Sequence, residues 1–378
     1  MSEDLSLYIH IPFCVRKCLY CDFPSYGGCE NTYGDYVNSL IRELKEGSRI
    51  YDGFKINTVF IGGGTPTVFE SRDLGRIMDT VLSRFDVADN AEITCEANPG
   101  TLDFKKLTEM RSMEINRLSM GVQAWQDRIL QMLGRIHDNK TFVDDMAMAK
   151  DAGFKNINCD LMFALPNQTI DDWQETLEKV IKLNPQHISA YSLIIEEGTP
   201  FKKMYDEEKI KPADEETDRK MYYLAKEILA NNGYHQYEIS NFAKEGFESR
   251  HNSVYWQTKE YIGFGLGAHS YFDGKRFHNT YDMKDYMGFS NYNNIKEDIE
   301  ILSENDKISE FMFMGLRMTK GISEKEFQRR FKTSVDSVYK KAIDELLEEK
   351  LIKRENGNIF LTEYGTDISN FVFEKFLL

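Results

Sequence analysis

Short apolar segments alternate with amphipathic segments over the first half of the chain. Six apolar runs of strand length lie at residues 5–11, 57–61, 91–96, 115–121, 154–162 and 187–193. Between most of them apolar residues recur every three or four positions, which predicts helices over residues 33–48, 71–85, 103–113, 140–152 and 169–183. Such alternation is typical of parallel strands joined by crossover helices. It predicts an α/β fold, a partial (β/α)6 barrel resembling a TIM barrel, with functional residues at the carboxyl ends of the strands.

The remainder of the chain lacks this regular alternation of strands and helices. A helix is expected at 218–231, a strand at 234–239 and a glycine-rich loop or hairpin at 261–277. Three helices follow at 310–318, 324–331 and 334–350, and then a hairpin whose turn is Asn356-Gly357-Asn358. We therefore predict a barrel over residues 1–205, a connecting segment that completes it over 206–300, and a small winged-helix-like α+β domain over 301–378.

Composition narrows the function classes. The 378 residues carry a formal net charge of −15, which argues against nucleic acid as the main partner because phosphate binding needs clustered Lys and Arg. No apolar run approaches the ~20 residues that span a bilayer. The acidic start, Met1 to Asp4, lacks the features of a secretory signal. We expect a cytoplasmic protein that is not an integral membrane protein.

The strongest chemical signal is the triplet Cys14-x3-Cys18-x2-Cys21. Cysteine thiolates are the usual ligands of iron–sulfur clusters. Three of them can hold three irons of a [4Fe–4S] cluster and leave the fourth iron open to the amino and carboxylate groups of S-adenosylmethionine. The alternatives are structural zinc and chance; zinc usually takes four ligands in paired knuckles, and no second knuckle is present. The other three cysteines are expected to be small buried residues.

Several further motifs occur at or near the ends of the predicted strands. They are Tyr8-Ile-His-Ile-Pro-Phe-Cys14, Gly62-Gly-Gly-Thr-Pro-Thr67, Glu96-x-Asn98-Pro99, Gly121-x-Gln123 and Asp160-Leu-Met-Phe-Ala-Leu-Pro166. With the cysteine triplet, they make the sequence resemble the radical SAM superfamily, and within it the branch of oxygen-independent coproporphyrinogen III oxidase. The resemblance covers nearly the whole chain.

This resemblance implies a cofactor-binding role for nine residues. Tyr8 and Tyr20 would flank the cluster and S-adenosylmethionine. Gly63, Gly64 and Thr65 would offer backbone groups to the aminoacyl end of the ligand, and Glu96 would accept hydrogen bonds from it. The last three, which match positions that contact a second S-adenosylmethionine in the oxidase, are Gln123, Arg135 and Asp160. Arg135 could equally pair with a carboxylate.

Two departures from the oxidase pattern disfavour decarboxylation. Phe23 stands where the oxidase has a fourth cysteine, and the first strand begins within a few residues of Met1, without the N-terminal extension of the oxidase. A third feature, His251-Asn-Ser-Val-Tyr-Trp256, is an HNxxYW motif typical of the HemW haem chaperones. Histidine is a common haem ligand, so His251 is a candidate axial ligand. The alternative is that His251 and Trp256 fix a contact between segments.

The motifs and the resemblance leave three functional hypotheses. The leading hypothesis is a HemW-like haem chaperone that binds the cluster, S-adenosylmethionine and haem or another porphyrin, and passes haem to an apo-haemoprotein, which can be membrane-associated. It would need an electron donor of the flavodoxin or ferredoxin type if radical chemistry takes place. The second is the oxidase activity itself. The third is a radical SAM enzyme acting on RNA, against which the charge of −15 weighs. No catalytic residue is assigned.

Overall fold

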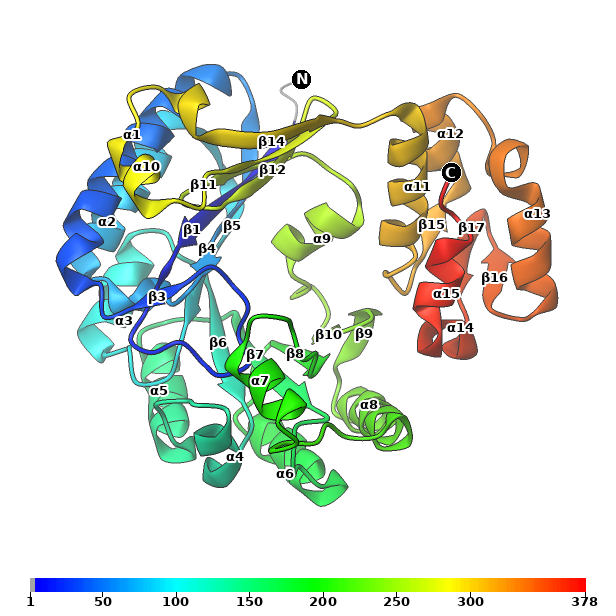
Figure 1. Cartoon of the computed structure of the whole chain (residues 1–378), viewed down its shortest axis with the longest axis horizontal. Helices are drawn as coiled ribbons and strands as arrows, with labels where there is room; N and C mark the ends of the chain where they lie inside the picture. The colour runs from blue at the N-terminus through cyan, green and yellow to red at the C-terminus, as the bar shows by residue number, and fades with distance from the viewer. Residues whose placement is uncertain (1–3) are drawn as a thin grey trace.

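The structure is a computed structural model that describes residues 4–378, so the first three residues of the acidic start lie outside it. Its centre is a twelve-stranded sheet within these residues (Figure 1). Six strands are parallel neighbours in chain order: β1 (Asp4–Ile11), β4 (Lys55–Gly63), β5 (Asp86–Ala97), β6 (Arg117–Gln123), β7 (Ile157–Phe163) and β8 (His187–Ser192). The predicted (β/α)6 barrel is confirmed, and the linear strand order leaves it open.

The crossover segments between these strands are helical and cover the outside of the sheet (Figure 1). They are η1 (Glu30–Thr32), α1 (Tyr33–Ile50), η2 (Pro66–Val68), α2 (Ser71–Arg84), α3 (Phe104–Ser112), α4 (Asp127–Met132), α5 (Asn139–Asp151) and α6 (Ile170–Lys182). Their apolar faces and the inner strand faces form one continuous core. Thr169 begins α6 with a capping box, in which its hydroxyl and the carboxylate of Asp172 each accept the other's backbone N–H.

The segment after β8 builds both edges of the sheet. It contains α7 (Pro200–Asp206), α8 (Glu215–Asn231), β9 (His235–Glu238), β10 (Asn241–Ala243), α9 (Arg250–Trp256), β11 (Tyr261–Phe264), β12 (His269–Phe272), β13 (Lys275–Asn279), α10 (Met283–Gly288), η3 (Tyr292–Ile295) and β14 (Lys296–Ile301). β10 and β9 extend the sheet beyond β8, whereas β11 pairs in parallel with β1 and β12–β14 continue from it. In the sequence, α9 lies between β10 at one edge of the sheet and β11 on the other side of it.

The expectation of a loop or hairpin at 261–277 was therefore only half right. β12 and β13 do form a hairpin, but β11 is a seventh parallel strand. The glycines in and just after β11 lower its strand propensity, but the packing requires them. A Cβ at Gly263 would lie 2.3 Å from the carbonyl oxygen of His269, and one at Gly265 would lie 2.5 Å from that of His10. Close backbone packing, not propensity, fixes this strand. The division of the chain at residues 205 and 300 stays a prediction.

The C-terminal unit stands beside the open side of the barrel (Figure 1). It consists of α11 (Glu304–Gly315), β15 (Ile322–Ser323), α12 (Glu324–Phe331), α13 (Val335–Glu348), β16 (Ile352–Glu355), β17 (Asn358–Leu361), α14 (Glu363–Asp367) and α15 (Ser369–Glu374). It has its own apolar core and a three-stranded sheet of order β15-β17-β16. Asn356 and Gly357 both have positive φ, as a tight hairpin turn requires, so the predicted wing is confirmed.

Candidate functional site: a cysteine-lined pocket and its aromatic neighbour

The three cysteines of the motif lie on one loop after β1. Cys14 ends the short strand β2 (Phe13–Cys14), which pairs in parallel with β3 (Tyr26–Gly27) and so closes the loop at its base. A turn in which the N–H of Cys21 donates to the carbonyl of Cys18 over 3.3 Å orders the middle of the loop. All three thiols are free, and all three residues line one cavity of about 480 Å³, which we name the cluster pocket.

Two of the cysteines are held by a chain of hydrogen bonds from the strand ends behind them. The hydroxyl of Thr65 donates to Sγ of Cys14 over 3.6 Å, and the guanidinium of Arg135 donates to Sγ of Cys18 over 3.3 Å. Asn98 joins the two, because its amide N donates to Thr65 over 2.6 Å and its amide O accepts from Arg135 over 2.6 Å. The Nε of Arg135 is buried and has no partner within residues 4–378. These linked hydrogen bonds fix the spacing of the Cys14 and Cys18 thiols before any ligand binds.

Two carboxylates from neighbouring strands also face the cluster pocket. Glu96 accepts the N–H of Gly63 over 2.9 Å, and Asp160 accepts from Ser119 over 3.0 Å and from Asn158 over 2.8 Å. Burial, followed by the nearby charge of Asp160, raises the pKa of Glu96 to about 8. At neutral pH the Glu96 carboxyl is therefore mostly protonated, and a cationic ligand group beside it would favour the ionised form.

The hydrogen bonds of the glycine loop after β4 limit which of its backbone groups can meet a ligand. The N–H of Gly63 is bonded to Glu96, that of Gly64 donates to the last carbonyl of β1 over 2.8 Å, and that of Thr65 donates to the carbonyl of Phe13 over 2.7 Å. All three N–H groups are thus used within the chain, so only carbonyl oxygens of this loop remain for a ligand's amino group. A Cβ at Gly64 would lie 2.5 Å from the carbonyl oxygen of Phe13, so this glycine permits the cysteine loop to pack against the strand end.

Of the other expected cofactor residues, two line the cluster pocket and one does not. Gln123 ends β6 with a φ of +68° at a register shift that begins at Gly121, a bulge that sets its side chain at the pocket wall. Tyr20 lines the pocket and packs its ring edge against Phe201. Tyr8 instead lines the adjoining cavity, where its hydroxyl lies 2.8 Å from Nδ1 of His10.

The cluster pocket has the donors that an iron–sulfur cluster requires. Burial raises the pKa of Cys14 and raises that of Cys21 to about 11, so these groups remain thiols until a metal displaces their protons. Within residues 4–378, no three His, Cys, Asp or Glu side chains converge on a single ion position. A lone tetrahedral zinc would need thiolates within ~4 Å of one another, given its short Zn–S bonds. Three thiols that line one cavity and a buried, unpartnered Nε of Arg135 fit an anionic group larger than a single ion.

A second cavity of about 460 Å³ adjoins the first and shares Phe23, Gly63 and Glu96 with it. We name it the aromatic pocket, since rings make up most of its wall. It is lined by Tyr8, His10, Phe23, Pro24, Phe60, Gly63, Glu96, His251, Asn252, Tyr255, Tyr261, Gly267, His269 and Tyr281.

His251 lies at the back of the aromatic pocket and is only 1% exposed. Its Nδ1 is 2.7 Å from the hydroxyl of Thr58, its Nε2 is 2.9 Å from that of Tyr255, and its ring stacks on Phe60 at 5.1 Å between centroids. Burial lowers the pKa of His251 to about 3. Both ring nitrogens are therefore engaged, and ligation of haem iron by His251 would require one of these bonds to break. In this conformation His251 fixes α9 to β4, which was the alternative considered from the sequence.

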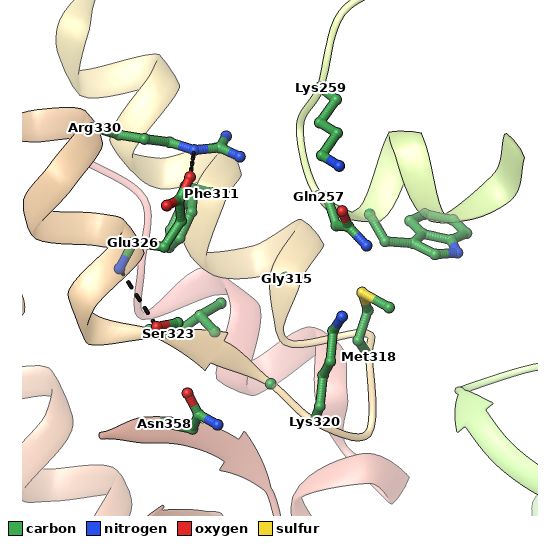
Figure 2. Close-up of a pocket in the computed structure, with 13 residues that line it drawn as sticks. Gln257, Lys259, Phe311, Gly315, Met318, Lys320, Ser323, Glu326, Arg330 and Asn358 are labelled. Atoms are coloured by element: carbon green, nitrogen blue, oxygen red, sulfur yellow. Dashed lines mark hydrogen bonds and ion pairs between the residues drawn. The ribbon is translucent and has the colours of Figure 1, made fainter. Parts of the chain in front are cut away.

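The last residue of the HNxxYW motif faces a third cavity, of about 430 Å³, between α9 and the C-terminal unit. The guanidinium of Arg317 lies over the Trp256 ring at 4.4 Å from its centroid. Figure 2 shows Lys259 and Lys320 extending into this gap from opposite sides, while Arg330 pairs with a glutamate of α12. The motif thus connects the barrel to the C-terminal unit at this end.

Asn98, His269 and Tyr281 contribute to these pockets in ways that the sequence did not indicate. Asn98 stood in a recognised motif, but its link between Thr65 and Arg135 follows only from the fold. His269 and Tyr281 lie in the glycine-rich stretch and beyond it, and they meet because β12 and β13 form a hairpin. No spacing pattern marks this last pair.

Comparison with known proteins identifies the family of this chain. The family model of the Radical SAM superfamily matches residues 8–180, and that of the HemN C-terminal domain matches residues 302–368. The chain is 37% identical over 379 residues to the "Heme chaperone HemW" of Lactococcus lactis, a match that covers 100% of this chain and 98% of that protein. It is 36% identical to the protein of the same name from Bacillus subtilis, over 98% of this chain and 99% of the relative.

Among solved structures, coproporphyrinogen III oxidase (HemN) from Escherichia coli superimposes with a TM-score of 0.87, over 99% of this chain and 90% of that one. The identity is 22%, so this likeness supports the fold alone. Within residues 4–378, none of the helices combines the length and apolarity needed to cross a membrane. From the near-complete match to the HemW proteins, we conclude that the chain belongs to the HemW family of the radical SAM superfamily.

Proposed function

We propose that the chain is a haem chaperone, which binds haem and passes it to an apo-haemoprotein. The observation that carries this proposal is the identity of 37% to a named haem chaperone across the whole chain. The presence of a ring-lined cavity beside the cysteine pocket supports it, because a porphyrin is a large planar apolar ligand.

In this proposal Cys14, Cys18 and Cys21 hold a [4Fe–4S] cluster, and S-adenosylmethionine binds beside it in the cluster pocket. When bound, the cluster would supply an electron for reductive cleavage of the sulfonium. Arg135 would hold the Cys18 thiolate by charge-assisted hydrogen bonding. Glu96, Gln123, Asp160 and the carbonyls of the glycine loop would orient the cofactor, and Tyr20 would cover it.

The partners of the proposed function are an acceptor apo-haemoprotein and an electron donor of the flavodoxin or ferredoxin type. The rim of the cluster pocket is exposed and basic, with Arg16 and Lys17 beside the cysteines. Phe23 at the same rim is 57% exposed. A basic rim in a chain of net charge −15 suits an acidic electron-transfer protein.

The test is anaerobic reconstitution with iron and sulfide, followed by haem titration monitored by absorbance and transfer to an apo-haemoprotein. We expect one haem per chain. The triple variant of Cys14, Cys18 and Cys21 to Ser should lose the cluster, whereas Cys29→Ser should keep it, because Cys29 lies outside the cluster pocket.

The same reconstituted sample should be assayed for conversion of coproporphyrinogen III to protoporphyrinogen IX. The proposal expects none. Absence of stoichiometric haem binding, or sustained decarboxylation, would overturn it.

A further inference from the structure

Three histidines line the aromatic pocket, and their surroundings differ. His10 is 3% exposed, with Nδ1 bonded to Tyr8 and Nε2 lying 3.0 Å from the carbonyl of Pro24. His251 is equally enclosed and bonded at both nitrogens. His269 is exposed, and within residues 4–378 its ring makes one hydrogen bond, from Nε2 to the hydroxyl of Tyr281 over 2.8 Å. Of the three histidines, His269 is therefore the one that a metal can reach without breaking the buried hydrogen bonds of His10 or His251.

The position of His269 is set by the β12–β13 hairpin and by the ring of Tyr281. It begins β12 and lies directly opposite His278 of β13, with 5.1 Å between the ring centroids. Its partner Tyr281 is 44% exposed, and the Tyr281 ring lies over the backbone of Gly267, where a Cβ would come within 2.6 Å of it. Gly267 has a φ of +64°. The bare backbone at Gly267 therefore gives the Tyr281 ring its place beside His269.

The ring of His269 is suited to bind iron. A ligating histidine commonly has its other ring nitrogen hydrogen-bonded, which fixes its tautomer and orientation, and Tyr281 supplies such a partner. Burial and the neighbouring His278 lower the pKa of His269, which favours its neutral imidazole. Neutral imidazole is the form that coordinates metals. The rings of Tyr8, Phe60 and Tyr255 line the same pocket.

We propose that haem binds in the aromatic pocket with the imidazole of His269 as an axial ligand of its iron, positioned by Tyr281. This inference rests on the proposed haem-chaperone function and names its site. Because His269 lies on the exposed β12–β13 hairpin and not in the core, haem bound to it would keep one side open to solvent and to the acceptor protein. That geometry suits a carrier that must release its cargo.

The experiment compares His269→Ala with wild type, using the full chain reconstituted with its cluster. The probes are haem and metal-free protoporphyrin IX. The control is His235→Ala, an exposed histidine on β9 at the opposite edge of the sheet. We expect His269→Ala to weaken haem binding at least tenfold, since even the loss of an outer-shell partner of a metal ligand costs about 10–100-fold. It should leave protoporphyrin IX binding unchanged, and added free imidazole should restore the absorption spectrum of the haem complex.

The outcomes separate the two proposals. If wild type binds haem one to one while His269→Ala keeps the same affinity and spectrum, the His269 assignment is wrong and the chaperone proposal stands. If protoporphyrin IX binding falls as much as haem binding, His269 acts on the pocket and not on the iron, which also overturns the assignment. If wild type binds no haem, both proposals fail. Tyr281→Phe, which removes the hydrogen-bond partner of His269, should change the absorption spectrum of the haem complex and weaken haem binding by about tenfold.

Discussion

Glu96 offers a sharp test of the electrostatics of the cluster pocket. The variant Glu96→Gln keeps the shape of the side chain and an oxygen that can accept the N–H of Gly63, but it cannot ionise. In the wild-type chain without ligands, burial and Asp160 raise the pKa of Glu96 from 4.5 to about 8. The variant removes this titration and leaves the neighbouring groups in place.

The sign and size of the effect follow from proton linkage. Between pH 4.5 and 8 the folded chain retains a proton on Glu96 that the unfolded chain has lost. Its contribution to stability is therefore complete below pH 4.5 and decreases as the pH rises toward 8. The slope approaches 1.4 kcal/mol per pH unit, and, allowing for partial exposure of the side chain, the loss from pH 5 to 7.5 is about 3 kcal/mol. The glutamine variant should become more stable relative to wild type by this amount.

The measurement is urea unfolding of the metal-free chain under anaerobic conditions at pH 5 and 7.5, for wild type, Glu96→Gln and the exposed control Glu197→Gln. The difference in unfolding free energy between Glu96→Gln and wild type should grow by about 3 kcal/mol at the higher pH. For Glu197→Gln it should stay constant. An equal difference for Glu96→Gln at both pH values would show that this carboxyl is already ionised in the folded chain, and would refute the reasoning.

Three further changes test other parts of the structure. Lys296→Met should lower the unfolding free energy by about 3 kcal/mol, because the fully buried carboxyl of Glu43 would lose its cationic partner, whereas Lys140→Met, at an exposed pair, should change it little. Gly64→Ala should reduce the iron content after reconstitution, as its Cβ would push against Phe13 beside Cys14; retention of a full cluster would contradict this. Thr169→Ala should destabilise the chain by about 1 kcal/mol through loss of the capping box, measured as a shift in the urea midpoint, and no shift would mean that the cap is redundant.

Much of the fold and half of the site were predictable from sequence. The six parallel strands follow from apolar runs separated by helical periodicity, and the carboxyl ends of those strands bring Cys14, Glu96 and Asp160 together. The sequence could not show that the glycine-loop N–H groups are already used, since that depends on how the end of β1 and the start of the cysteine loop pack against the glycine loop. It also could not reveal β11, whose glycines fit against His10 and His269.

The roles of the histidines were the hardest to predict. The HNxxYW motif drew attention to His251, yet the fold encloses that ring between Thr58 and Tyr255. His269 belongs to no recognisable pattern, and its exposure and its contact with Tyr281 arise from a hairpin formed by short strands of weak periodicity. A motif identifies a family, but access to a side chain depends on tertiary contacts that no local spacing encodes.

The pairing of β11 with β1 imposes an order on assembly during synthesis. β1 emerges first from the ribosome, but its outer edge has no partner until residues 261–264 are made. At about 5–20 residues per second, the intervening roughly 250 residues take some tens of seconds to translate. Throughout that interval the cysteine loop, which follows directly on β1, is not yet enclosed by β11–β14 or their hairpin. In the nascent chain the three thiols are therefore synthesised, and remain accessible, before the wall of the aromatic pocket exists.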